Sequence, residues 1–327
     1  MSTKENKNAA QVELFKLIQK DVSPRIPLAS RIAKVLNISL DSAYRRIRGD
    51  FEISFEEGIT LSKHFGISLD MLLFGIGKMQ YTLIPSEFKG IENNLKFAQQ
   101  LLDITDNIKG SQEGEIFITA ADLPAFHFIA HKELTLFHVY SWYKNVYDYK
   151  GTYEDFIKEM YNDEIMNLLV QAHTNFQNTT SSEIWTENSI EPTLKLIRYH
   201  FETNHFSDTK SPVLICEQIV SILDTLEGWI KDGKKGVEKT PYRFYISEID
   251  IGNTIIYFKN KSEPNCMIRL FTINGINIKD AGFCEDVELW IKSVIRHSTL
   301  ISEISTKERI QFLTSQKQKI LGVLNNL

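Results

Sequence analysis

The chain has 327 residues, of which 43% are hydrophobic and 24% are charged, and its formal net charge is −5. These values are typical of a folded protein with room for a small domain and a larger one, and no run approaches the roughly 18 apolar residues of a membrane span. Cys216, Cys266 and Cys284 lie far apart, a pattern that favours reduced thiols in a cytoplasm over disulfides or a zinc site.

The first predicted elements are short helices joined by a tight turn. A helix over residues 12–20 precedes residues 28–36, where apolar side chains recur at helical spacing on one face. Asn37 tolerates the left-handed conformation that such a turn requires. Ser39 then stands at an N-cap position, where its hydroxyl can accept a hydrogen bond from the amide of residue 41 or 42. The sequence therefore predicts a second helix that begins at Leu40.

The helix predicted over residues 40–48 carries three arginines. Ala43 and Ile47 lie one turn apart and face inward, and Gly49 is a natural stop. The outward positions are Asp41, Ser42, Arg45 and Arg48. Arginine can bind guanine bidentately or clamp a phosphate, and the exposed helix N-terminus favours a phosphate oxygen. This face suits nucleic acid.

Two further helices complete the segment. Ser54 and Glu57 have the spacing of a capping box for a helix over residues 55–65. Ser68 stands at the N-cap of a closing helix over residues 69–74. The order is then five helices, with the tight turn between the second and the third.

This segment resembles the phage-repressor and Cro type of helix-turn-helix, the group that includes the xenobiotic-response-element regulators. The resemblance runs from about Val12 to Leu73. It places residues 28–36 on the positioning helix and residues 40–48 on the recognition helix. Two departures are Asn37 at the usual turn glycine, and Arg46 where many members bury an aliphatic residue that Ile47 supplies one position later.

The resemblance implies a set of DNA contacts. Bases would be read by Asp41, Ser42, Arg45 and Arg48, and phosphates anchored by Ser39, Arg46 and Lys63. Residues 1–80 hold 12 Lys+Arg and 9 Asp+Glu, or +3, whereas the remainder holds 25 and 33, or −8, which together give the net −5. The difference has the sign expected of a DNA-binding segment but is modest.

The sequence predicts a connecting helix after the helix-turn-helix segment. Gly75 and Gly77 form a short hinge, and the following apolar residues alternate spacings of three and four: Phe88, Ile91, Leu95, Ala98, Leu102 and Thr105. Such a seam is compatible with a dimeric coiled coil and equally with a single helix packed on its own domain. A dimer would hold two recognition helices about 34 Å apart over two half-sites.

Residues 114–327 predict an α+β domain in which helix dominates. A strand is expected over residues 115–120, and antiparallel strands over 242–250, 253–259 and 267–273. Helices are expected over 126–147, 153–177, 192–202, 212–231, 284–304 and 307–324. The strands form a small antiparallel sheet. A domain of this kind joined to a DNA-binding domain is the architecture expected of a one-component sensor.

The larger domain carries no catalytic motif. It has no phosphate-binding loop, no GxGxxG and no GxSxG. His127, His131 and His138 would share a face on one helix, and His200 and His205 form a second pair, but histidines with local hydrogen bonds in a core are the more common case. We expect no enzyme, no metal and no cofactor.

Aromatic residues are dense between residues 126 and 149. They could line an apolar ligand pocket, although such clusters are more often simply core. The members are Phe126, Phe128, Phe137, Tyr140, Trp142, Tyr143, Tyr147 and Tyr149.

The expected organisation is mostly α. Residues 1–76 form a five-helix helix-turn-helix DNA-binding domain, residues 77–113 a linker and connecting helix, and residues 114–327 a domain for dimerisation and reception of a small-molecule or peptide effector. The N-terminus lacks the apolar segment of a secretory signal. We expect a cytoplasmic transcriptional regulator that binds double-stranded DNA as a homodimer, without contact with a membrane. The alternative is an adaptor whose helical module binds a partner protein.

Overall fold

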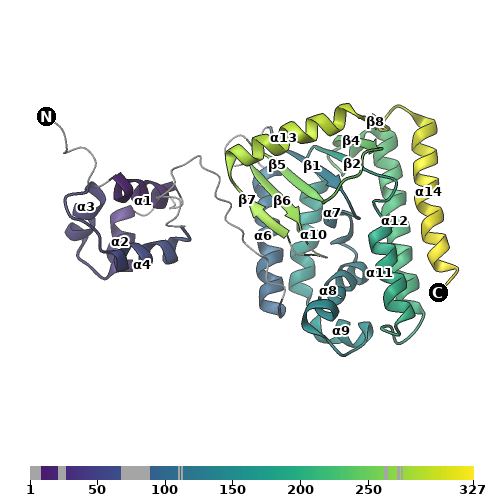
Figure 1. Ribbon diagram of the computed structural model, residues 1–327, viewed down its shortest axis with the longest axis horizontal. Coiled ribbons are helices and arrows are strands. Elements are labelled where there is room, and N and C mark those ends of the chain that lie inside the picture. Colours follow the sequence, from purple (N-terminus) through teal and green to yellow (C-terminus); the bar gives the residue numbers. More distant parts are fainter. Residues whose placement is uncertain are drawn as a thin grey trace. The chain divides into compact units, whose positions relative to one another are not determined.

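The computed structural model describes residues 9–20, 27–67, 89–109, 111, 113–260, 264–270, 273 and 275–327. The chain divides into two compact units, Met1–Thr82 and Leu83–Leu327 (Figure 1). Helix is the main secondary structure of the described residues, as the sequence predicts. Each unit has its own hydrophobic core.

Four helices make up the described part of the smaller unit. They are α1 (Ala9–Lys20), α2 (Leu28–Leu36), α3 (Leu40–Arg48) and α4 (Phe55–Phe65). Their apolar faces meet in a core that contains Leu14, Phe15, Ile18, Ala29, Ile32, Ala43 and Leu61. The closing helix predicted over residues 69–74, and the hinge at Gly75 and Gly77, lie outside the described residues.

The turns and caps of this unit follow the sequence closely. Asn37 ends α2 in the left-handed region, at φ 52° and ψ 49°. The side chain of Ser39 caps α3 by accepting a hydrogen bond from the Ser42 amide, and Gly49 ends the helix at φ 79°. Ser54 and Glu57 form both bonds of the predicted capping box at the start of α4. These local predictions are confirmed.

The larger unit contains an eight-stranded mixed sheet. Its order is β3-β4-β2-β1-β5-β6-β7, with β8 also paired to β4. The β1–β2 and β2–β4 pairs are parallel, and the other pairs are antiparallel. The strands are β1 (Glu115–Ala120), β2 (Ser181–Trp185), β3 (Lys234–Lys235), β4 (Thr240–Ser247), β5 (Ile255–Lys259), β6 (Asn265–Arg269), β7 (Gly275–Ile278) and β8 (Ser298–Leu300).

The prediction of a small antiparallel sheet is therefore wrong for the sheet as a whole, although the predicted strands that correspond to β5 and β6 do pair antiparallel. Strand β2, which the sequence analysis missed, lies between β1 and β4 and makes the centre of the sheet parallel. Its sequence, Ser-Ser-Glu-Ile-Trp, shows no alternation of polar and apolar residues, because all five residues are buried. A short central strand that is covered on both faces gives no periodic signal.

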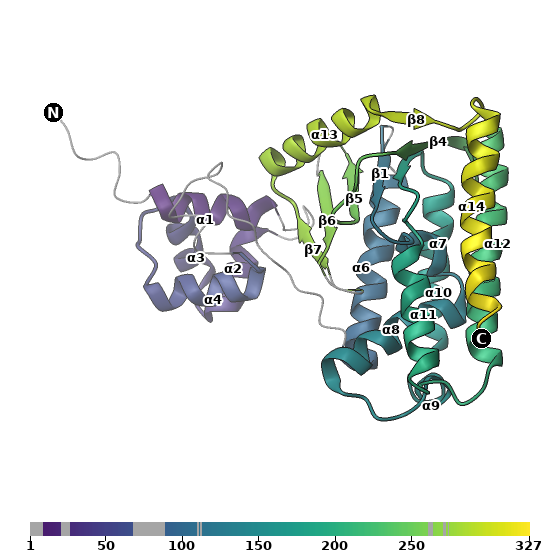
Figure 2. The same cartoon turned by 45° about the vertical axis from the view of Figure 1, so that its right-hand side comes forward.

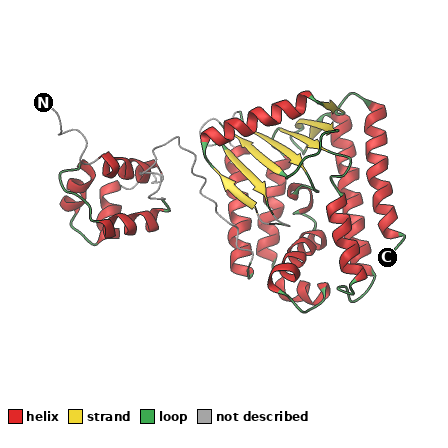
Figure 3. Ribbon diagram, in the orientation of Figure 1, coloured by secondary structure: helices red, strands yellow, loops and turns green. Residues whose placement is uncertain are grey.

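Helices cover both faces of the sheet (Figures 1 and 2). Along β1, Ile116 and Ile118 enter the main core, while Phe117 between them joins a second cluster under α13. The helices are α6 (Ile91–Lys109), α7 (Ala125–Phe128), α8 (Lys132–Tyr147), α9 (Tyr153–Met160), α10 (Asp163–Gln177), α11 (Glu191–Glu202), α12 (Lys210–Asp232), α13 (Ala281–Arg296) and α14 (Thr306–Leu324). Figure 3 shows how helix dominates this unit.

Three predicted helices are shorter than the sequence analysis had them. Residues 126–147 divide into α7 and α8, and residues 153–177 divide into α9 and α10, where Asn162 caps the second helix by accepting from the Ile165 amide. The helix predicted over residues 284–304 ends at Arg296, and β8 follows. In each case an apolar pattern continues through the break. The break before α10 has a side-chain cap, whereas α8 begins after His131 without one.

The connecting helix, α6, packs inside the larger unit. Ala98, Leu102 and Thr105 of the predicted seam are buried there, together with Leu101 and Ile108. Leu95 is half-buried and Ile91 is exposed, and Phe88 lies outside the described residues. The buried part of the seam thus faces its own domain, so a coiled coil through these three residues is not available.

Candidate nucleic-acid interface

The outward face of α3 is the candidate interface in the smaller unit. Asp41, Arg45 and Arg48 are exposed, whereas Ala43 on the opposite side is completely buried and Ile47 packs on the core. The 3.6-residue period of the helix produces this division, because the two apolar residues lie four positions apart. The backbone of α3 is fixed at both ends by the Ser39 cap and Gly49.

The two exposed arginines differ in their surroundings. The Nε of Arg48 lies 2.9 Å from Oδ2 of Asp50, in an ion pair whose side chains are both more than half exposed. An exposed ion pair such as that of Arg48 with Asp50 contributes little to stability, and Arg48 can readily exchange Asp50 for another anion. Within the described part of the chain, the guanidinium of Arg45 has no ion pair or hydrogen bond. Both guanidinium groups are therefore accessible to a ligand.

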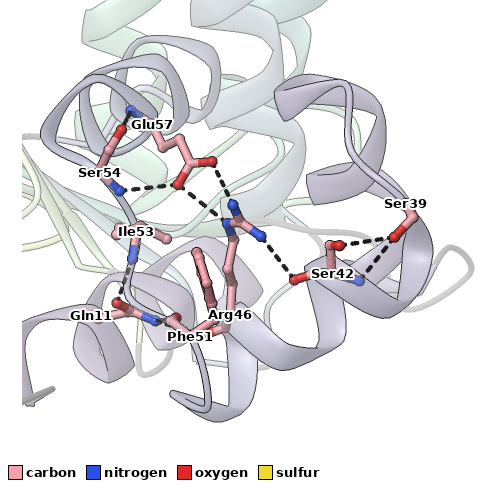
Figure 4. Close-up of polar contacts among 8 residues, drawn as sticks. All are labelled: Gln11, Ser39, Ser42, Arg46, Phe51, Ile53, Ser54 and Glu57. Carbon is pink, nitrogen blue, oxygen red and sulfur yellow. Dashed lines mark hydrogen bonds and ion pairs between the residues drawn. The ribbon is translucent and has the colours of Figure 1, made fainter.

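Arg46 is used inside the domain (Figure 4). Its Nη2 and Nε lie 2.9 and 3.2 Å from the two carboxylate oxygens of Glu57, and Nη1 donates to the carbonyl of Ser42 at 3.3 Å. The guanidinium also lies 4.7 Å from the ring centroid of Phe51. Only 13% of its side chain is exposed. We therefore correct the expectation that Arg46 anchors a phosphate, because its donors already hold α3 to α4.

Glu57 carries the negative charge of this contact. Burial alone would raise the pKa of its carboxyl, but the bonds from Arg46 and from the Ser54 amide outweigh burial and hold the pKa below its usual value. The carboxylate therefore stays ionised at neutral pH. It accepts the capping-box hydrogen bond from the Ser54 amide and at the same time forms the ion pair with Arg46.

Gln11 holds the loop between α3 and α4, a role that the sequence analysis missed. Its Nε2 donates to the carbonyls of Arg46 and Phe51, both at 2.8 Å, and its Oε1 accepts from the Ile53 amide at 3.0 Å (Figure 4). The residue is only 8% exposed. A buried glutamine on the apolar side of a helix is a usable signal, because a buried amide requires partners.

The remaining predicted contact residues lie on the surface in different roles. Ser39 caps α3, and its hydroxyl also donates to Oγ of Ser42 at 2.9 Å. Ser42 is half-buried. Lys63 is exposed in the last turn of α4. Large apolar side chains are exposed nearby in sequence, namely Leu40, Tyr44, Phe51 and Phe55.

The histidines of the larger unit do not gather at one point. His127 bonds to the carboxylate of Glu183 at 2.8 Å, in a buried contact that Trp185 shares as a donor. His200 and His205 lie against each other, with their Nδ1 atoms 2.8 Å apart. No group of three or more potential metal ligands is present in the part of the chain that the structure describes.

The aromatic segment is mainly core. Phe137 and Tyr140 are buried, and Tyr143 and Tyr149 pack against the same core. Phe126 and Phe128 also line an apolar cavity between helices and sheet. Phe126 and Phe128 are thus core residues that also line the cavity, and binding of a ligand there stays a prediction.

Comparisons of the chain with protein-family models, with curated proteins and with solved structures found no match. Among the described helices, none combines the length and the apolarity needed to cross a bilayer.

Proposed function

We propose that this protein is a sequence-specific DNA-binding transcriptional regulator that inserts α3 into the major groove. The observation that carries the proposal is the outward face of α3, where Asp41, Arg45 and Arg48 stand exposed on a short helix that is capped at both ends. A rigid helix with accessible arginines is what recognition of base edges and phosphates requires.

Each exposed residue has a chemical role in this proposal. Arg45 donates to the O6 and N7 atoms of a guanine, and Asp41 accepts from a cytosine amino group. Arg48, Lys63 and the N-terminal residues Ser39 and Ser42 bind near phosphates or base edges. Arg46 acts only indirectly, because it fixes the angle between α3 and α4 through Glu57.

We propose that the regulator binds as a homodimer. A second copy would supply a second recognition helix, which raises both affinity and specificity. Because Ala98, Leu102 and Thr105 are buried within the larger unit, the contact between copies would use another surface.

A salt titration tests DNA binding. Affinity for a fluorescent duplex of random sequence is measured by anisotropy as the salt concentration rises, for the wild type and for Lys63→Ala. We expect affinity to fall steeply with salt, and the salt dependence to be weaker in Lys63→Ala, because a protein that makes one phosphate contact fewer releases fewer counterions when it binds. Arg296→Ala is the control, since it removes an exposed arginine at the end of α13 in the larger unit. Absence of binding in dilute buffer would refute the proposal.

A second candidate function is an adaptor that binds another protein through the smaller unit. Four exposed apolar side chains favour it: Leu40 (48% exposed), Tyr44 (43%), Phe51 (50%) and Phe55 (74%). Aromatic residues of this kind are frequent at protein interfaces. The same titration separates the two candidates, because an adaptor would not retain random duplex at low salt.

A further inference from the structure

The larger unit contains an apolar cavity of about 150 Å³. Helices α6, α8 and α10 enclose it together with β6 and β7, and its walls include Ala98, Leu101, Met166, Leu169 and Met267. A cavity of about this volume with such walls accommodates one benzene molecule. The space is thus sufficient for a single small ring.

Three polar side chains line this cavity and leave buried atoms without a hydrogen-bond partner among the described residues. They are Asn94 on α6, His138 on α8 and Asn277 on β7. The unpartnered atoms are the amide oxygen Oδ1 of each asparagine and both ring nitrogens of His138. His138 is only 1% exposed, and its ring stacks on Phe128 with the centroids 4.3 Å apart. A buried polar atom left without a partner is costly, so three residues around one cavity indicate a missing partner.

The chemistry of these groups restricts the ligand. A neutral imidazole offers one donor and one acceptor, and an amide oxygen offers only acceptor sites. The ligand must therefore carry a group that donates a hydrogen bond and can also accept one, as a hydroxyl does. The remaining walls are apolar and include two methionines, whose sulfurs favour aromatic rings.

The charged residues at the cavity wall oppose an ionic ligand. Arg269 lines the cavity, but its Nη2 lies 2.9 Å from Oδ2 of Asp122, which is almost fully buried. The guanidinium charge is therefore already balanced. A carboxylate in the cavity would lose its hydration without a free cation to compensate it.

We infer that the larger unit binds a small uncharged aromatic alcohol of the monocyclic phenol class, with the ring in the cavity and the hydroxyl against His138. Asn94 or Asn277 accepts from the same hydroxyl or from a second donor on the ring. Every group that forms this site belongs to the larger unit, so ligand binding can be measured without DNA.

The test is calorimetric titration of the full chain, without DNA, with phenol and with toluene. The two probes have nearly the same shape, but only phenol carries a hydroxyl. We expect phenol to bind and toluene to bind about tenfold more weakly, because toluene leaves the polar atoms unsatisfied. No binding of phenol, or equal binding of the two probes, would overturn the proposal.

Two variants and a control locate the site. His138→Leu removes the hydroxyl partner, and we expect it to weaken phenol binding about tenfold while toluene binding is kept or improved. Ala98→Leu fills the cavity and is expected to abolish binding of both probes. His297→Leu changes an exposed histidine after α13 and should bind phenol like the wild type. Wild-type affinity for phenol in both folded cavity variants would contradict the assignment.

Folding is checked separately, by tryptophan fluorescence. All four tryptophans belong to the larger unit, so their emission reports the part of the chain that contains the cavity. His138→Leu is expected to fold, because it replaces an unsatisfied buried polar group by an apolar one. Should it fail to fold, Ala98→Leu and the comparison of phenol with toluene still decide the matter.

Discussion

Adjacent arginines on α3 have opposite surroundings. Arg45 is exposed, whereas Arg46 is bound to Glu57 and to the carbonyl of Ser42. We therefore assign DNA recognition to Arg45 and stabilisation of the fold to Arg46, although both are arginines. This contrast gives a matched pair of variants.

Arg45→Ala should weaken binding to a selected duplex and leave folding intact. The expected loss is roughly 1–3 kcal/mol of binding free energy at the base that Arg45 reads. Anisotropy titrations with the selected site and with single-base variants of it measure this. Equal affinities of the variant and the wild type would remove Arg45 from the contact set.

Arg46→Ala should act on stability. It leaves the partly buried Glu57 carboxylate without its ion-pair partner, and we expect the free energy of unfolding of the smaller unit to fall by roughly 1–3 kcal/mol. Native-state hydrogen exchange of the α4 amides reports this loss. A variant that exchanges like the wild type but loses DNA binding would instead support a direct phosphate contact.

His138 makes stability depend on pH. Burial, with a smaller effect of Arg269, lowers its pKa to about 4 against the influence of Asp122, whereas an unfolded histidine has a pKa of about 6.5. Between these values the unfolded chain binds a proton that the folded chain does not, so stability falls as the pH drops from about 6.5 towards 4.

His138→Leu removes this contribution, so its free energy of unfolding should rise relative to the wild type as the pH falls through that window. Urea unfolding followed by tryptophan fluorescence at neutral and at acidic pH measures the difference. Because His173 and His200 have pKa values lowered in the same direction and are present in both proteins, their effects cancel. A difference that does not change with pH would show that folding does not shift the pKa of His138.

The start of α4 depends on one carboxylate in two contacts. Glu57 closes the capping box with Ser54 and pairs with Arg46. Since the folded pKa of Glu57 lies below its ordinary value, its contribution is complete above the unfolded pKa and is lost as the pH falls through the folded pKa.

Glu57→Gln should therefore destabilise the smaller unit most at neutral pH and progressively less in acid. Thermal unfolding by circular dichroism at a series of pH values checks this. An unfolding midpoint that differs from that of the wild type by the same amount at every pH would mean that the charge of Glu57 is not what holds α4.

The turns and caps of the smaller unit could be predicted from the sequence, whereas β2 and the order of the strands in the sheet could not. Asn37, Ser39 and Gly49 act on their own turns, so their roles follow from residue type and spacing. Strand β2 is defined by β1 and β4 on either side. Nothing local in its sequence reveals that pairing.

The same distinction applies to the candidate site. The outward positions of α3 follow from helical spacing. The engagement of Arg46 by Glu57, and of Gln11 by the following loop, joins residues that lie 11 to 42 positions apart. Side-chain partners over such separations are set by tertiary packing, which a single sequence does not display.

At the scale of the whole molecule, two self-contained units share one chain. The smaller unit carries the proposed DNA-binding face, and the larger unit carries the cavity. Helix α6 is the first described helix of the larger unit, and four of its residues line the cavity: Asn94, Phe97, Ala98 and Leu101. Helix α6, which follows the smaller unit in the sequence, is thus part of the proposed ligand site.

Selection of bound duplexes from a random oligonucleotide pool tests whether α3 reads DNA sequence. We predict that the full chain enriches one site with two related half-sites about one helical turn apart, and that Arg45→Ala relaxes the preference at one base pair in each half-site. If no oligonucleotide is retained even in dilute buffer, or if Arg45→Ala enriches the same site with the same preference, the proposed role of α3 is contradicted.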